Sequence, residues 1–475
     1  MSFDTETLKR FINDKWDHSI IQNLSDYIKI PNKSPAFDKN WQNNGFIDQV
    51  VKNVAEWCQQ QNVFGLKLSI ERIEGRTPLL FIDVDSSGND SDSVKTVLLY
   101  GHLDKQPEMV GWDEDKGPWK PVMIDDKLYG RGAADDGYAV FSAITAIKAL
   151  QEQGVPHARC VLIIESCEEG GSSDLPFYID KLQNKIGTPD LVICLDSGCG
   201  NYDQLWLTTS LRGAIIGELS VELLKEGIHS GNGGGVIASS FRVLRDILDR
   251  LEDTKTGRIL IDGVNSAIPD KRVLQAEKAA EVLGKDFEKS FPLLENVKMV
   301  SDDPKELILN RTWRPSLSYT GIDGIPNSSE AGNVLRPFTS MKLSLRLPPT
   351  IDAKKIINHL KEILESKPPY NAKVQFKVLD STKGWNSPEL SGWLEKALDE
   401  ASLTYFGRGP VFMGEGGSIP FMNLLATKFP EAQFMITGVL GPHSNAHGPN
   451  EFLHIPTVKK LTCCIAQVLS SHAVT

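Results

Sequence analysis

The chain has 475 residues, more than one ordinary hydrophobic core accommodates, so roughly two or three domains are expected. Its hydrophobic fraction of 40% and charged fraction of 24% are typical of a soluble globular protein. The formal net charge of −11, without a run of lysines or arginines, argues against a nucleic-acid-binding surface.

The beginning of the chain is polar and lacks the apolar segment of a signal peptide. No apolar run approaches the length of about 20 residues that a membrane helix needs. The seven cysteines are an odd number, and no C-x-x-C pair occurs, which fits reduced thiols. We therefore expect a cytoplasmic protein with neither a membrane nor a nucleic acid as partner.

Helical and strand-like patterns alternate in the first part of the chain. Predicted helices cover residues 5–30, 46–61 and 138–150, and predicted strands cover 66–70, 79–84, 97–100, 160–164 and 191–195. This alternation predicts an α/β domain with a mostly parallel sheet that is flanked by helices.

The pattern changes near residue 210. Strands are predicted at 214–223, 315–319, 341–347 and 374–379, and helices at 237–251 and 353–366. The order β-α-β-β-α-β predicts an α+β domain of ferredoxin-like type, although residues 252–311 within it carry no clear motif. After residue 384 the first pattern returns, with a helix at 387–402, a strand at 434–439 and a last helix from about 456. We therefore expect one domain formed by residues 1–209 and 385–475, interrupted by a second domain of residues 210–384.

Acids and a histidine follow the predicted strands of the first domain directly. His102 and Asp104 stand two apart, so they project from one side if the strand continues. Such a pair is a metal ligand with its orienting carboxylate, or half of a catalytic dyad. Asp135 and Asp136 lie between glycines before a helix, where capping explains one of them, and we favour Asp136 as the cap.

Glu168, Glu169 and Asp196 follow two further strands. Carboxylates gathered at one edge of a sheet repel one another unless a cation compensates their charge. The candidate ligands are His102, Asp135, Glu169, Asp196 and one histidine of residues 443–447. Such a set suits two divalent ions bridged by a carboxylate, with Glu168 free to act as a general base.

A series of motifs runs in order through nearly the whole chain. They are G-H-L-D-x-Q-P (101–107), Y-G-R-G-x-x-D-D (129–136), E-S-x-E-E-x-G-S (165–172), L-D-S (195–197), L-R-G (211–213), H-S-G (229–231), G-E-G-G-S-I-P (414–420) and H-G-P-N-E (447–451). This series resembles the M20 family of dinuclear zinc peptidases, in particular its carnosine-dipeptidase-like branch.

The resemblance implies a role for each candidate ligand. His102 and Asp196 match the terminal ligands of one metal, and Glu169 and His447 match those of the other. Asp135 matches the bridging carboxylate, in a segment where the family has a cis peptide bond to the next residue. Two Zn²⁺ ions are therefore implied for each subunit, and Mn²⁺ is the alternative.

The C-terminal loop holds two histidines, which leaves one ligand open. His447 is preferred because Asn and Glu follow it at the family spacing, and His443 is the alternative.

The family also implies catalytic and substrate-binding groups. Asp104 matches the carboxylate behind the ligating imidazole, and Glu168 matches the general base and acid. His229 matches a lid histidine that reaches the partner subunit's active site in dimeric members, which implies a homodimer formed through the inserted lid domain. The residues matched to substrate binding are Arg346, Ser418, Asn333 and His229.

The implied activity is that of a metal-dependent dipeptidase acting on small peptides with a free C-terminal carboxylate. Glu168 would activate a water held between the metals. An N-acyl-amino-acid deacylase of the same family is the alternative, although the long inserted domain favours the dipeptidase branch. An inactive relative that only binds is a more remote alternative, because every ligand and Glu168 are present.

Overall fold

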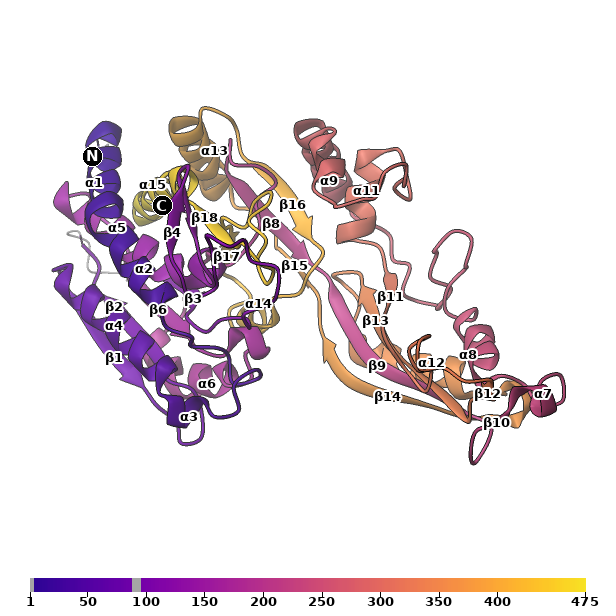
Figure 1. Ribbon diagram of the computed structural model, residues 1–475. Coiled ribbons are helices and arrows are strands. Elements are labelled where there is room, and N and C mark those ends of the chain that lie inside the picture. Colours follow the sequence, from indigo (N-terminus) through magenta and orange to yellow (C-terminus); the bar gives the residue numbers. More distant parts are fainter. Residues whose placement is uncertain (1–3, 88–94) are drawn as a thin grey trace.

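The computed structural model describes residues 4–87 and 95–475, so the first three residues of the polar N-terminal stretch lie outside the described residues. The chain forms two bodies that are connected by long strands (Figure 1). One body contains both chain ends and a six-stranded sheet, and the other is built on a four-stranded sheet. Among the described helices, none has both the length and the apolar character to span a membrane.

The central sheet has the strand order β1-β2-β6-β3-β7-β17. Four neighbouring strands, from β6 to β17, run parallel, and an antiparallel pair, β1 and β2, extends the sheet on one side. Its strands are β1 (Leu66–Glu71), β2 (Leu79–Val84), β3 (Thr96–His102), β6 (Arg159–Glu165), β7 (Leu191–Cys194) and β17 (Gln433–Ile436). The mostly parallel sheet predicted from the sequence is therefore confirmed.

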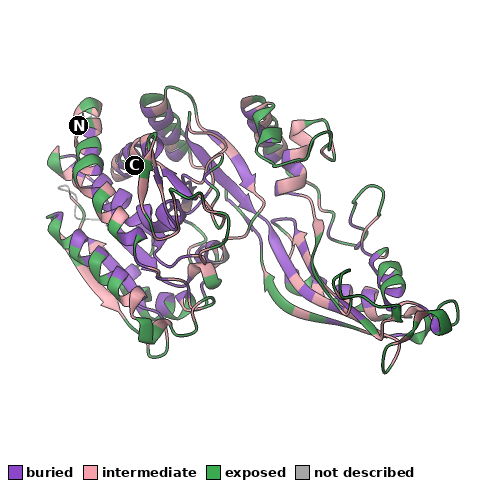
Figure 2. Ribbon diagram, viewed as in Figure 1, coloured by how far each residue is buried: buried purple, intermediate pink, exposed green. Residues whose placement is uncertain are grey.

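Helices cover both faces of this sheet because its strands are apolar on both sides. Leu99 belongs to the hydrophobic core under one set of helices, and its neighbour Leu98 belongs to the core under the other set. The first set is α1 (Thr5–Lys15), α2 (Ile21–Ile28), α4 (Phe46–Gln60), α5 (Tyr138–Glu152), α13 (Gly392–Phe406) and α15 (Ile455–Ala473), and the second is α6 (Leu175–Ile186) and α14 (Pro420–Lys428). Figure 2 shows the buried strands enclosed by helices whose outer faces are exposed.

The predicted helix over residues 5–30 is not continuous. A π-helical turn, η1 (Trp16–Ile20), separates α1 from α2. The side chain of Trp16 is buried there, and its indole N–H donates a hydrogen bond to Thr462 of α15 at 3.2 Å. The extra residue in the turn thus falls where the helix packs against the end of the chain.

The second body has the sheet order β11-β13-β9-β14, antiparallel throughout. Two helices pack on one face of this sheet, which is the ferredoxin-like arrangement that the order of the elements predicts. Its elements are β9 (Gly213–Glu222), α8 (Ser240–Leu248), β11 (Ser316–Asp323), β13 (Phe338–Leu347), α12 (Ala353–Glu365) and β14 (Lys373–Thr382). A small tip at its far end contains β10 (Ile228–His229), α7 (Ser230–Gly233) and β12 (Val334–Leu335) (Figure 1).

A third sheet, which the sequence patterns did not predict, lies between the two bodies. It has the order β15-β8-β16, formed by β8 (Trp206–Leu211), β15 (Trp385–Asn386) and β16 (Val411–Glu415). The segment without a motif folds into α9 (Asp270–Leu283), α10 (Asp286–Lys289) and α11 (Pro304–Thr312). These helices pack on β8 and β16 through Leu283, Trp206 and Met413.

Candidate metal centre

The candidate ligands gather where the parallel strands of the central sheet end. His102 is the last residue of β3, Glu168 and Glu169 form the 3₁₀ turn η3 (Glu168–Gly170) after β6, and Asp196 follows β7. Because β3 lies between β6 and β7 in the sheet, three adjacent strands deliver these side chains to one edge. Ligand sites of open α/β sheets lie at this edge.

Asp135 reaches the same place from the turn η2 (Ala133–Gly137), just before α5. The peptide bond between Asp135 and Asp136 is cis, as the resemblance implies. Gly132, before the turn, has φ of +82°, and a Cβ atom there would lie 2.8 Å from the side chain of Lys105. Only glycine fits this approach, which brings Asp135 over the end of β3.

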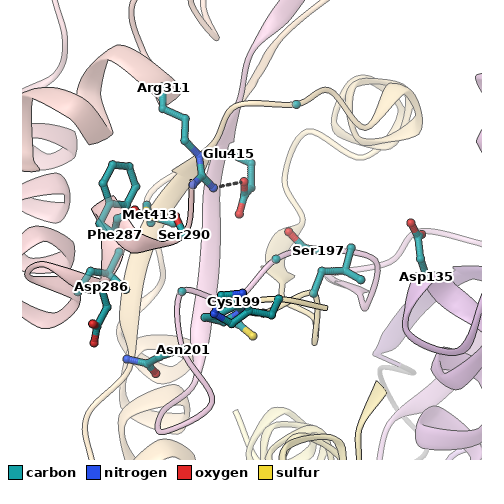
Figure 3. A pocket seen from close by; sticks show the side chains of 18 of the residues that line it. Asp135, Ser197, Cys199, Asn201, Asp286, Phe287, Ser290, Arg311, Met413 and Glu415 are labelled. Carbon is teal, nitrogen blue, oxygen red and sulfur yellow. Dashed lines mark hydrogen bonds and ion pairs between the residues drawn. The ribbon is translucent and has the colours of Figure 1, made fainter. Parts of the chain in front are cut away.

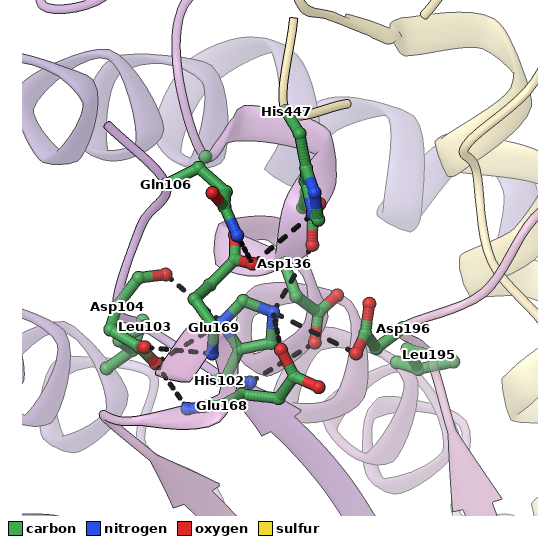
Figure 4. Close-up of polar contacts among 12 residues, drawn as sticks. His102, Leu103, Asp104, Gln106, Asp136, Glu168, Glu169, Leu195, Asp196 and His447 are labelled. Carbon is green, nitrogen blue, oxygen red and sulfur yellow. Dashed lines mark hydrogen bonds and ion pairs between the residues drawn. The ribbon is translucent and has the colours of Figure 1, made fainter. Parts of the chain in front are cut away.

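The carboxylate of Asp135 lies between His102 and His447, the two histidines labelled in Figure 4. Its Oδ1 is 3.3 Å from Nε2 of His102, and its Oδ2 is 3.1 Å from Nε2 of His447. Nε2 of His447 is also 3.2 Å from Oε2 of Glu169, and Nε2 of His102 is 3.9 Å from Oδ2 of Asp196. The five side chains therefore form two groups that share one carboxylate.

Asp104 lies behind His102 and is fully buried. Nδ1 of His102 is 3.1 Å from the backbone carbonyl oxygen of Asp104 and 3.5 Å from its Oδ1. The same carboxylate accepts the backbone N–H groups of Glu168 at 3.0 Å and of Glu169 at 3.1 Å. This contact leaves Nε2 of His102 facing the other ligands and fixes the turn that carries both glutamates.

The electrostatics of the site fit bound cations. Burial and the charge of Asp135 raise the pKa of Asp196 to about 7, and burial and the charge of Asp196 raise the pKa of Glu168 well above its usual value. Burial alone would raise the pKa of Asp135 as well, but hydrogen bonds with His102 and His447 hold it below its usual value. Carboxylates and imidazoles crowded in this way are a donor set for divalent ions, whose charge relieves the repulsion.

Asp136 does not cap the following helix, so that expectation is wrong. Among the residues that the structure describes, none caps α5 with its side chain, and Oδ2 of Asp136 accepts the backbone N–H of His102 at 3.2 Å. This hydrogen bond holds the end of β3, which carries His102.

A cavity of about 870 Å³ opens beside the ligands. Its lining includes Asp135, Glu168 and Asp196, and also Phe287 and Arg311 from the segment without a motif. Figure 3 shows Asp135 on one side of the cavity and Phe287 and Arg311 on the other. The guanidinium of Arg311 lies 2.9 Å from the carboxylate of Glu415. Residues from α9 to α11 therefore form a wall of the site that the sequence patterns did not assign.

The structure brings Arg346 and Ser418 together at the junction of the two bodies. Nη1 of Arg346, on β13, lies 3.5 Å from Oγ of Ser418, which lines the cavity. The hydroxyl of Ser418 in turn donates to the backbone carbonyl of Arg212.

The other two substrate-binding candidates lie far from the ligands of their own chain. His229 and Asn333 are exposed at the tip of the second body, where the carbonyl oxygen of Asn333 accepts the N–H of Ser230 at 2.9 Å. Figure 1 shows this tip at the opposite end of the four-stranded sheet from the central sheet. Both loop histidines line the cavity, and Nε2 of His447 lies 3.1 Å from Asp135 and 3.2 Å from Glu169.

Two features of the site lie within motifs but had no assigned role. Nε2 of Gln106 donates a hydrogen bond of 2.6 Å to Oε2 of Glu169. Arg131 forms a buried ion pair of 2.6 Å with Glu451. Gln106, Arg131 and Glu451 belong to the motifs, so the sequence singles them out. Their spacing does not show which atoms their side chains contact.

Comparisons with known proteins show the family of the chain. The profile described as Peptidase family M20/M25/M40 matches residues 98–471. The chain is 32% identical to the Cys-Gly metallodipeptidase DUG1 of Saccharomyces cerevisiae over 89% of this chain and 87% of that protein. It is 28% identical to a cysteinylglycine-S-conjugate dipeptidase of Corynebacterium striatum over 79% of this chain and 81% of that protein.

The fold is likewise similar to that of solved structures. Human carnosine dipeptidase 1 superimposes with a TM-score of 0.77 at 23% identity, covering 99% of each chain. With a family match over most of its length and a shared fold, the chain belongs to peptidase family M20/M25/M40.

Proposed function

We propose that the protein is a dinuclear metal-dependent dipeptidase that hydrolyses dipeptides with a free C-terminal carboxylate. The observation that carries this proposal is the position of Asp135, whose two oxygens face His102 and His447 separately. A carboxylate shared in this way suits two ions a few ångströms apart. The printed names of the relatives, which are dipeptidases, support peptides as the substrate class.

The ligands divide between the two ions. His102 and Asp196 would hold one ion, Glu169 and His447 the other, and Asp135 both. Imidazole and carboxylate ligands suit Zn²⁺, which we propose as the metal, with Mn²⁺ as the alternative. When bound, the ions supply Lewis acidity for the scissile carbonyl and for the attacking water.

Glu168 is the proposed general base and acid. It is next to the ligand Glu169, and its Oε2 lies 4.0 Å from Nε2 of His102, so it faces the site without occupying the position between the histidines. Its carboxylate would take a proton from the attacking water and return it to the leaving amine. Asp104 assists by holding the backbone of Glu168 and the ring of His102.

Arg346 and Ser418 are proposed to bind the terminal carboxylate of the substrate. Burial lowers the pKa of Arg346, which nevertheless remains a cation at neutral pH. A guanidinium and a hydroxyl at the edge of the cavity can form charge-assisted hydrogen bonds to a carboxylate. Such contacts would fix the register of the peptide and favour dipeptides.

We further propose that the protein acts as a homodimer. His229 and Asn333 lie at the tip of the second body, so they would reach substrate only in a partner subunit's site. In this division, residues 1–209 and 385–475 are the catalytic domain and residues 210–384 the lid and dimerisation domain. The position of α9 to α11 on β8 and β16 means that part of the lid sequence packs on the catalytic side.

A cytoplasmic location is also proposed. All seven cysteines are buried and free, which fits a reducing compartment.

The proposal is tested by preparing the metal-free protein and restoring activity with Zn²⁺ or Mn²⁺. Dipeptides, tripeptides and N-acyl-amino acids are compared with each metal. We expect dipeptide hydrolysis to return as the second equivalent of metal binds. Preference for N-acyl-amino acids would indicate a deacylase, and two bound ions without turnover of any substrate would indicate an inactive relative.

A further inference from the structure

The ion pair between Arg131 and Glu451 is one of the most deeply buried in the protein. The side chains are 1% and 0% exposed, and Nη1 of Arg131 lies 2.6 Å from Oε2 of Glu451. Removing two charges from water is costly, and the cost is offset only when further hydrogen bonds satisfy both groups. Arg131 and Glu451 both form such hydrogen bonds.

Each partner belongs to a segment that carries a candidate metal ligand. Nε of Arg131 donates to the carbonyl oxygen of Pro107 at 3.1 Å, five residues after His102. Nη2 of Arg131 donates to the carbonyl oxygen of Gly448 at 2.8 Å, next to His447. The second oxygen of Glu451 accepts the N–H of Gly132 at 3.0 Å, in the segment that leads to Asp135.

The loop that carries His447 is held by hydrogen bonds. The hydroxyl of Tyr202 donates to the carbonyl oxygen of Pro442 at 3.1 Å, and the N–H of Phe452 donates to the carbonyl oxygen of Ser444 at 3.1 Å. The side chain of His447 is 54% exposed, whereas those of Asp135 and Glu169 are 7% and 3% exposed. The left-handed backbone positions in this loop are His443, Asn445, His447 and Asn450. A loop of this conformation, outside the sheets, is not positioned by core packing, so its polar contacts decide where His447 lies.

We propose that Arg131 and Glu451 are positioning residues for the second metal site. By joining the segments of His102, Asp135 and His447, the pair holds the imidazole of His447 against Asp135 and Glu169. It thereby sets the affinity for the ion that Glu169 and His447 share. This inference rests on the proposed dinuclear site, but it concerns metal binding and not the identity of the substrate.

The first test is the variant Arg131→Lys. Lysine keeps the positive charge, and therefore the balance with Glu451, but a single ammonium cannot reproduce the planar fork that reaches both Pro107 and Gly448. The metal-free variant is titrated with Zn²⁺ in competition with a chelator. We expect one of the two ions to bind about 10–100-fold more weakly, with the other unchanged. Asp83→Asn, which removes the partly buried pair of Asp83 with Arg159 elsewhere in the same body, is the control and should leave both affinities unchanged.

The second variant replaces both partners, Arg131→Met with Glu451→Leu. No charge is then left unpaired, so the fold should tolerate the change, as judged by thermal unfolding of the metal-free protein. If the pair positions His447, this variant still binds one ion more weakly, and His447→Ala weakens the same ion.

Wild-type affinity for both ions in Arg131→Lys and in the double variant would overturn the inference. Equal weakening of both ions would also overturn it, because that pattern indicates general structural damage. A wild-type protein that binds fewer than two ions would instead contradict the proposed function, so the two failures are distinguishable.

Discussion

The carboxylate of Asp104 accepts a hydrogen bond of 3.0 Å from the backbone amide of Glu168, so the group behind one metal ligand also holds the proposed base. Oδ1 of Asp104 lies 3.5 Å from Nδ1 of His102, and its Oδ2 accepts the amide of Glu169. One buried side chain therefore sets the orientation of an imidazole and of the turn that contains both glutamates.

Asp104→Asn removes one of these acceptors while keeping the size of the side chain. We expect metal affinity to fall by about 10–100-fold, because groups behind a ligand set its orientation and basicity. Chelator competition measures this change. Asp113→Asn alters an exposed aspartate on a nearby loop and serves as the control. Unchanged affinity in Asp104→Asn would show that His102 does not depend on this contact.

Amidating the C-terminus of a dipeptide substrate tests Arg346 and Ser418. The wild-type enzyme should lose roughly 2–4 kcal/mol in kcat/KM, the range for leaving a buried charge unpaired. In Arg346→Ala, the free acid and the amide should be cleaved at similar rates. If the wild-type enzyme already cleaves both equally, the terminal carboxylate binds elsewhere or not at all.

His229→Ala tests whether the tip of the second body serves a partner's site. In the partner's site, His229 would stabilise the oxyanion that forms during hydrolysis. Such a side chain is commonly worth about 10²–10³ in rate, so the variant should be severely impaired with its metals intact. Mixing it with Glu168→Gln should restore activity, up to about a quarter of wild type if two-fold dimers form statistically, since each mixed dimer has one complete site. Demonstrated subunit exchange without any recovery would place the action of His229 within its own chain.

The choice between the two loop histidines is tested by His447→Ala and His443→Ala. His447 lies 3.1 Å from Asp135 and 3.2 Å from Glu169, so its removal should release one ion and leave the other bound. Elemental analysis after dialysis gives the stoichiometry. His443→Ala, the matched control in the same loop, should keep both ions, and the reverse pattern would exchange the two assignments.

The architecture of the central sheet could be predicted because its strands are short, apolar and separated by helical patterns. His102 and Asp104 could be paired from their spacing of two residues. The third sheet was missed because β8 and β16 lie far apart in the sequence and join the two bodies. Neither strand has a pattern of apolar and polar residues that identifies the strand with which it pairs.

In the site, too, local motifs could be recognised, but contacts between residues far apart in the sequence could not be predicted. The sequence indicates which residue types surround the metals, but it does not show that Arg131 meets Glu451, because this contact spans more than 300 residues of chain. The cavity wall with Phe287 and Arg311 was missed because no motif marks residues 252–311. Its helices acquire their position by packing on β8 and β16.

The most direct test of the account is Glu168→Gln, measured both for metal content and for dipeptide turnover. Glutamine keeps the size of the side chain and the backbone contact with Asp104, but it cannot accept the proton of the attacking water. We expect two bound ions, as in the wild type, and a fall in kcat of more than about 10²-fold, the contribution typical of a positioned base. Turnover within about tenfold of wild type, with both ions bound, would contradict the assignment of Glu168 as the base.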